Sequence, residues 1–175
     1  MDDQALPQCA APSEGRNGLA LLAAIGTYGA AQGLSAAVAR MLRGRSTRRQ
    51  YQGDVALPSF APPGQAFPLV WSVLNVTTAT SAWRLWRAGS RPASDPALLL
   101  WLAAVPLRSA YVPLAFGRRW WWPATGSAAL LSAALASYAA AARRTSRTAA
   151  VLALPEVGWT AFATVLSAAV ARRNS

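Results

Sequence analysis

The segment Pro58-Ser-Phe-Ala-Pro-Pro-Gly-Gln-Ala-Phe-Pro-Leu-Val-Trp-Ser-Val-Leu74 joins a proline-rich loop directly to an apolar run that begins with aromatic residues. The proline rings fix the backbone of the loop, and the apolar run continues to about residue 88. An apolar run of about 20 residues is long enough to cross the hydrocarbon core of a membrane. This segment therefore predicts a stiff loop that lies against the end of a membrane helix.

The composition of the whole chain agrees with this interpretation. Hydrophobic residues make up 54% of the 175 positions, charged residues only 13%, and eight residues are tryptophan. A soluble domain would carry about 25% charged residues. Several further apolar spans are separated by short breaks that contain arginine or proline. We expect an all-α integral membrane bundle of five transmembrane helices.

The expected organisation is an N-terminal tail, residues 1–16, followed by one membrane domain, residues 17–174. The helices are expected at about 17–42, 66–88, 96–116, 121–142 and 148–171, with a first loop, called loop one, at 43–65. Asp95-Pro96 fits a helix cap followed by a first-turn proline. The first span is expected to be retained as a membrane helix, because the tail before it is acidic and lacks the basic region of a signal peptide.

The formal charge of +11 comes from seventeen basic residues, all arginine, most of which lie at the ends of apolar spans. This placement is typical of membrane topology, so we expect membrane lipid and no nucleic acid as a partner. Nine arginines fall on the face with loop one and the C-terminus: Arg40, Arg43, Arg45, Arg48, Arg49, Arg118, Arg119, Arg172 and Arg173. Seven fall opposite: Arg16, Arg84, Arg87, Arg91, Arg143, Arg144 and Arg147. The difference favours an outside N-terminus and a cytoplasmic C-terminus, and the exclusive use of arginine suggests a bacterial inner membrane.

The residue inventory excludes several chemistries. The chain has no histidine, so a Ser-His-Asp triad and histidine-ligated metals are excluded. Cys9 is the only cysteine, which excludes an intrachain disulfide or a cysteine metal cluster. We therefore expect no metal site and no required cofactor, and binding by shape, stacking and a few polar contacts.

Motifs in three of the expected helices resemble those of the TspO/MBR family, the tryptophan-rich sensory or translocator proteins. Residues 58–74 resemble the family's loop one and second helix, and Tyr111-Val112-Pro113-Leu114-Ala115-Phe116-Gly117 resembles its Trp-Ser-Pro-Leu-Phe-Phe-Gly. Residues 154–166 resemble its last helix. The resemblance covers about residues 17–174 and implies a membrane sensor or transporter that binds porphyrin and other hydrophobic or sterol-like ligands, with a pocket between loop one and the bundle.

The chain departs from the family's motifs where that pocket is expected. The family's second-helix tyrosine is Asn75, its third-helix asparagine and tryptophan are Arg108 and Tyr111, and its fifth-helix tyrosine is Glu156. Helical spacing places two groups of residues each on one face: Ala104, Arg108, Tyr111 and Ala115, and Phe67, Trp71, Asn75 and Thr78. We therefore expect a pocket with altered walls, whose ligand the resemblance does not define.

Arg108 and Glu156 are the only charges deep within the expected spans. Each would cost about 2.5 to 3.5 kcal/mol at the centre of a lipid-exposed helix, so a shared inward location is favoured. We expect that they pair or that together they hold a polar group of the ligand. The alternative is that Arg108 snorkels and Glu156 lies near an interface.

The expected ligand is a flat hydrophobic molecule of the tetrapyrrole, sterol or isoprenoid class. Its expected contacts are Phe60, Pro62, Pro63, Phe67, Trp71, Asn75, Arg108, Tyr111, Glu156 and Trp159. Asp54 either faces this pocket or is a solvated loop charge. One alternative is a membrane enzyme that acts on an isoprenoid-like or tetrapyrrole substrate, with Glu156 as acid or base and Arg108 as a second catalytic candidate. The other is a structural membrane partner with a decayed pocket.

The other tryptophans and the glycines of the first span admit simpler interpretations. We expect interfacial anchors near the span ends, at Trp83, Trp86, Trp120, Trp121 and Trp122. Trp71 and Trp159 either stack on a ligand or pack within the bundle. Gly26 and the Gly29-x-x-x-Gly33 motif either form a homodimer contact or serve helix packing within one bundle.

Overall fold

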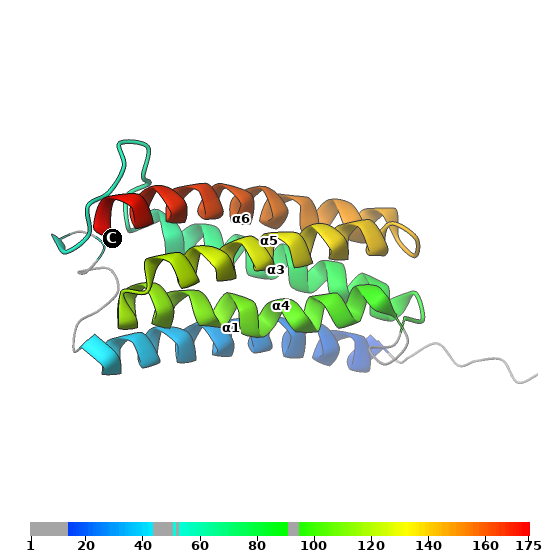
Figure 1. Cartoon of the computed structure of the whole chain (residues 1–175). Coiled ribbons are helices and arrows are strands. Elements are labelled where there is room, and N and C mark those ends of the chain that lie inside the picture. The colour runs from blue at the N-terminus through cyan, green and yellow to red at the C-terminus, as the bar shows by residue number, and fades with distance from the viewer. Residues whose placement is uncertain (1–13, 44–50, 52, 91–94) are drawn as a thin grey trace, which may run out of the picture.

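Five long helices run side by side in the computed structural model, which describes residues 14–43, 51, 53–90 and 95–175 (Figure 1). They are α1 (Glu14–Arg43), α3 (Ala66–Arg87), α4 (Pro96–Val112), α5 (Trp121–Ala142) and α6 (Arg147–Asn174). The six-residue π-helical segment η1 (Pro113–Arg118) continues α4. The all-α bundle predicted from the sequence is confirmed. Cys9, Arg45, Arg48, Arg49 and Arg91 lie outside the described residues.

Four of the helices are long and apolar enough to cross a membrane: Leu21–Leu42, Pro96–Arg118, Trp121–Ala142 and Arg147–Asn174. The helix α3 is not among these four, although with 22 residues it equals α5 in length. At about 1.5 Å per residue both extend over about 33 Å, which matches the hydrocarbon core of about 30 Å. The polar residues that lower the hydropathy of α3, such as Asn75, Thr78 and Ser81, are buried inside the bundle. We infer that α3 crosses with its neighbours α1 and α6.

The bundle exposes apolar side chains and buries polar ones. Leu22, Leu130 and Val165 are more than 60% exposed, whereas Thr78 and Glu156 are fully buried. In water this distribution would be unfavourable, but in lipid a polar side chain is stabilised by facing the bundle interior. The surface of the bundle is therefore the surface of a membrane protein.

The helices close into a ring in the order α1, α3, α6, α5 and α4, each packing against its two neighbours. Alanines fill the closest contacts, including the fully buried Ala79, Ala104 and Ala153, because small residues let helix backbones approach. The Ser81 hydroxyl on α3 links three helices. It lies 2.6 Å from the Tyr138 hydroxyl of α5 and donates a hydrogen bond to the Ala149 carbonyl of α6 at 2.6 Å. This buried polar contact fixes α3 against the α5–α6 hairpin.

Two caps shape the ends of α4. The Asp95 carboxylate accepts a hydrogen bond from the Ala97 N–H at 2.8 Å, which confirms the predicted start of the helix. At the far end Pro113 lacks the N–H that an α-helical bond requires, and the chain widens into η1. Arg119 then adopts a left-handed conformation (φ 58°), and the Trp120 N–H bonds the Leu114 carbonyl at 2.9 Å. This sharp reversal places Arg119 next to loop one.

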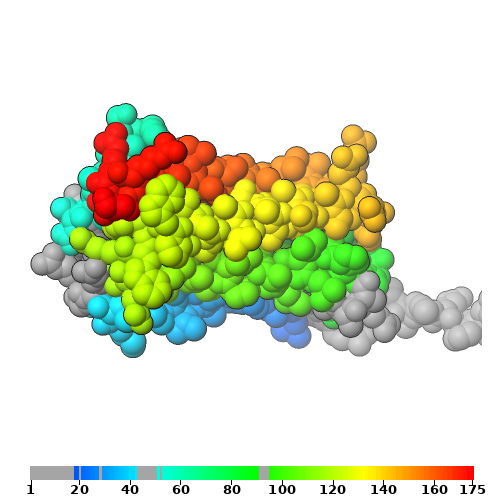
Figure 2. Space-filling model, in the orientation of Figure 1, coloured from blue at the N-terminus to red at the C-terminus, as the bar shows by residue number. Residues whose placement is uncertain are grey.

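Loop one, the α4–α5 connection and the C-terminus lie at the same end of the bundle (Figure 1). Figure 2 shows the teal residues of loop one gathered beside the red end of α6. This is the arrangement that the arginine count assumed. The α3–α4 and α5–α6 connections lie at the opposite end.

Candidate functional site

A cavity of about 340 Å³ lies beneath loop one, inside the ring of helices. All five helices, η1 and loop one contribute to its walls. Its aromatic lining consists of Tyr51, Phe67, Trp71, Tyr111, Phe116, Trp121 and Trp159. A largely apolar cavity of this size, with a few polar groups, is typical of a site for a small hydrophobic molecule.

The aromatic side chains form a continuous wall from loop one to α6. The rings of Tyr51 and Phe67 meet edge to face with centroids 5.2 Å apart, and Phe67 meets Trp159 in the same way at 5.9 Å. Trp159 in turn contacts Phe162 at 5.4 Å. Because such pairs hold one another in fixed orientations, the wall is a rigid apolar surface.

A cluster of polar side chains, which we call the polar floor, closes the cavity on the side away from loop one. It consists of Gln32, Asn75, Thr78, Arg108 and Glu156, from α1, α3, α4 and α6. Arg108 forms an ion pair with Glu156 and donates to the Asn75 side-chain oxygen, while Thr78 donates to the Glu156 carboxylate. The predicted Arg108–Glu156 pair is therefore present, and the snorkelling alternative is wrong because both side chains are buried in the bundle.

Arg108 also connects the polar floor to the aromatic wall. Its guanidinium carbon lies 5.0 Å from the centre of the Trp71 ring, which is a cation–π distance. Arg108 lines the cavity, whereas Glu156 lies behind the cavity wall. A ligand in the cavity thus meets the cation of the pair before its anion.

Loop one is fastened over the cavity by residues from the two other segments at the same end. The Asn174 side chain accepts from the Ala56 N–H at 2.9 Å and donates to the Ala56 carbonyl at 3.0 Å. Arg173 donates to the Leu57 carbonyl at 3.1 Å, and Arg119 pairs with Asp54 at 3.9 Å. The loop is therefore a lid held by the C-terminus and by the α4–α5 connection. Asp54 does not face the cavity, because Arg119 holds it at the surface.

The structure brings five of the ten predicted ligand contacts to the cavity surface. These are Phe67, Trp71, Arg108, Tyr111 and Trp159. Asn75 and Glu156 lie behind them and contact Arg108. Three predicted contacts in loop one, Phe60, Pro62 and Pro63, are not among the lining residues: Phe60 packs on Phe162, and the Pro62 carbonyl accepts from the Tyr51 hydroxyl at 2.9 Å.

The sequence prediction for Trp121 was wrong, and Tyr51 was missed. Trp121 is 8% exposed, lines the cavity and meets Phe116 edge to face at 6.4 Å. Its neighbours Trp120 and Trp122 are each 52% exposed, as interfacial anchors would be. Successive residues of a helix point about 100° apart, so three adjacent tryptophans cannot share one environment. Tyr51 had only its aromatic character in loop one as a signal.

The fold defines an integral membrane helical bundle, with an internal, largely apolar cavity beneath loop one. The TspO/MBR family model matches residues 21–173, nearly the whole chain. The chain therefore belongs to the TspO/MBR family, and the resemblance noted in the sequence is confirmed. No curated protein matches it.

Proposed function

We propose that this protein binds a flat hydrophobic ligand, of the tetrapyrrole, sterol or isoprenoid class, in the cavity beneath loop one. Family membership supports a membrane sensor or transporter role. The observation that carries the ligand proposal is the continuous aromatic wall of Tyr51, Phe67 and Trp159, which lines the same cavity as the Arg108–Trp71 contact. A flat ring system would stack on the wall, and its polar edge would reach Arg108.

A second group favours a ligand with a hydrogen-bond acceptor. The Trp159 indole nitrogen is buried and has no hydrogen-bond partner within the part of the chain that the structure describes. Buried donors are nearly always paired, and Trp159 lines the cavity. A carbonyl or carboxylate on the ligand would satisfy this donor. A carboxylate would also compete with Glu156 for Arg108.

The test is to fill the cavity from one wall. Ala163 lines the cavity on α6, and Ala161, two residues earlier, is exposed on the outside of the same helix. We expect Ala163→Phe to abolish binding of protoporphyrin IX, measured as the midpoint of an absorbance titration in detergent. Ala161→Phe is the matched control and should bind as the wild type does. Equal affinities for the two variants would refute the proposed site.

The geometry does not favour the enzyme alternative. A general acid or base must reach the reacting atom, but the Glu156 carboxylate lies behind the cavity wall, engaged by Arg108 and Thr78. Loss of any turnover in Glu156→Gln with ligand affinity unchanged would support the enzyme instead. The structural-partner alternative would require that the cavity bind no ligand in the same titration.

The orientation and the assembly are part of the same proposal. The arginine distribution favours a cytoplasmic C-terminus and loop one, and the exclusive use of arginine suggests a bacterial inner membrane. A side chain added at Gly26, Gly29 or Gly33 would meet no atom within 4 Å, so this glycine face lies outside the bundle and is available to a second copy. Cross-linking in membranes should capture a dimer that Gly29→Leu weakens. Unchanged cross-linking would remove this contact.

A further inference from the structure

A second recess lies at the end of the bundle away from loop one, and the proposed ligand site does not use it. It has a volume of about 310 Å³ and is lined by residues of α1, α3 and α4. On each of these helices the polar floor lies between the recess and the cavity. The recess residue and the floor residue are Thr27 and Gln32 on α1, Trp86 and Asn75 on α3, and Trp101 and Arg108 on α4. The recess and the cavity are therefore distinct sites.

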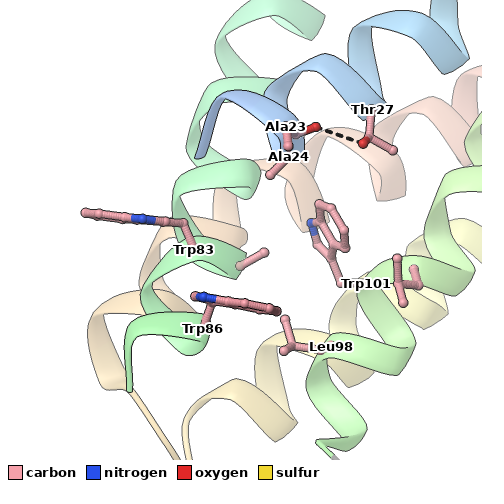
Figure 3. A pocket seen from close by; sticks show the side chains of 9 residues that line it. Ala23, Ala24, Thr27, Trp83, Trp86, Leu98 and Trp101 are labelled. Atoms are coloured by element: carbon pink, nitrogen blue, oxygen red, sulfur yellow. Dashed lines mark hydrogen bonds between the residues drawn. The ribbon is translucent and has the colours of Figure 1, made fainter. Parts of the chain in front are cut away.

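Tryptophan side chains dominate the walls of this recess (Figure 3). Trp86 extends from α3 toward Leu98 of α4, and the Trp101 ring stands between α4 and the α1 residues Ala24 and Thr27. Trp101 is 7% exposed, whereas Trp86 is 46% exposed. The recess thus has a buried inner wall and an open outer edge, which in a membrane faces lipid.

The outer edge carries positive charge. The Arg87 guanidinium lies 5.0 Å from the centre of the Trp83 ring, which also lines the recess. Arg84, Arg143, Arg144 and Arg147 lie at the same end of the bundle. The nearby carboxylate of Asp95 caps α4. An apolar channel with an arginine and a tryptophan at its mouth matches an acyl chain attached to an anionic headgroup, because basic residues attract anionic lipid and tryptophan suits the interface.

We propose that this recess binds one acyl chain of an anionic phospholipid, whose phosphate contacts Arg87. The chain lies against Trp101 and Trp86, and the headgroup remains at the interface beside Trp83. This site does not depend on the ligand proposed for the cavity, because the polar floor separates the two.

The test uses full-length protein in a series of phosphatidylcholine nanodiscs with increasing fractions of phosphatidylglycerol or of phosphatidylcholine that carries brominated acyl chains. Bromine quenches tryptophan at contact, and the difference between wild type and Trp101→Phe isolates the Trp101 signal. We expect brominated phosphatidylglycerol to quench Trp101 at a lower mole fraction than brominated phosphatidylcholine. Arg87→Gln should raise the phosphatidylglycerol fraction for half-quenching about fivefold, the effect of one basic residue near an anionic surface.

Two matched controls separate this site from general surface attraction. Arg84→Gln removes the same charge from the same turn, but Arg84 is about 100° around the helix from Trp83 and should leave the quenching unchanged. Thr27→Phe fills the recess and should abolish Trp101 quenching, whereas Ala30→Phe, at an exposed position of α1 that does not line the recess, should not.

Four results would overturn the proposal. Equal quenching by the two lipids would remove the anionic selectivity, and an equal effect of Arg84→Gln and Arg87→Gln would reduce it to surface charge. Quenching unaffected by Thr27→Phe would place the chain elsewhere. Absence of Trp101 quenching by either lipid would leave the recess without an acyl chain, whatever the porphyrin titration of the cavity shows.

Discussion

Removing Arg108 alone should destabilise the bundle far more than removing Arg108 and Glu156 together. Glu156 is fully buried and Arg108 is 5% exposed, so the pair has almost no water to replace a lost partner. Arg108→Leu would leave the Glu156 carboxylate with Thr78 as its hydrogen-bond donor. The substitution would also leave Asn75 without its guanidinium donor.

The expected magnitude follows from these contacts. Breaking a buried pair by removing one partner costs about 3–5 kcal/mol, because an uncompensated charge remains. Loss of the Arg108–Trp71 contact adds about 0.5–2 kcal/mol. Replacing both partners with hydrophobic residues is often close to neutral. We therefore expect Arg108→Leu/Glu156→Leu to recover most of the loss.

The assay is unfolding by sodium dodecyl sulfate in mixed micelles, followed by circular dichroism for wild type, both single variants and the double variant. Arg172→Leu, on the exposed last turn of α6, is the control, and its effect should stay within about 0.5 kcal/mol. The cycle isolates the coupling between the two side chains. A loss below about 1 kcal/mol for Arg108→Leu, well under the cost of an uncompensated buried charge, or a double variant equal to the sum of the singles, would refute the reasoning.

Three further predictions concern the lid and the helix contacts. Asn174→Ala removes two hydrogen bonds to Ala56, worth about 1 kcal/mol each. The substitution should therefore increase the rate of ligand release several-fold in stopped-flow measurements. An unchanged rate would mean that loop one does not control access to the cavity. Gly117→Val should destabilise the bundle by about 1–3 kcal/mol, because a Cβ at this position would lie 2.7 Å from the Leu42 side chain. A Cβ at Gly126 would meet no atom within 4 Å, so Gly126→Val should not destabilise the bundle. Equal unfolding midpoints for the two variants would contradict this prediction. Burial, and secondarily Tyr111, raises the pKa of Tyr51 above its ordinary value of 10.0. The hydrogen bond from the Tyr51 hydroxyl to the Pro62 carbonyl therefore stabilises the closed loop fully below pH 10.0, and this contribution is lost as the pH rises through the raised pKa. Ligand affinity should fall there in wild type but not in Tyr51→Phe, and parallel curves would exclude Tyr51.

The sequence could predict those features of this protein that the membrane environment requires. The thickness of the bilayer requires apolar spans of about 20 residues, so the positions of the helices could be predicted from the sequence. An isolated charge is also costly within the bilayer, and this cost alone predicted that Arg108 and Glu156 form a pair. Helical periodicity then placed Phe67 and Trp71 on the face that lines the cavity.

The parts that depend on irregular backbone could not be predicted. Asn174 and Ala56 are 118 residues apart, and their contact depends on the path of loop one, which no periodic pattern records. Glycine usually indicates a left-handed backbone conformation in a sequence, but here the residue in that conformation is Arg119. The turn of α5 that sends Trp121 inward and Trp122 outward follows from this reversal, so the error at Trp121 has the same cause.

The polar floor also bears on whether the bundle would sense or conduct the ligand that we propose. A ligand that passed along the bundle axis from the cavity to the recess would meet the buried Arg108–Glu156 pair, and a charge left there without its partner costs about 3–5 kcal/mol. A neutral ligand that stays in the cavity would meet Arg108 and Trp71 without breaking the pair, whereas a ligand carboxylate would compete with Glu156 for Arg108. The contacts of Arg108 reach α3 through Asn75 and α6 through Glu156, and Gln32 extends them to α1. For the proposed ligand, these contacts favour a sensing role, in which binding affects several helices, over conduction along the axis.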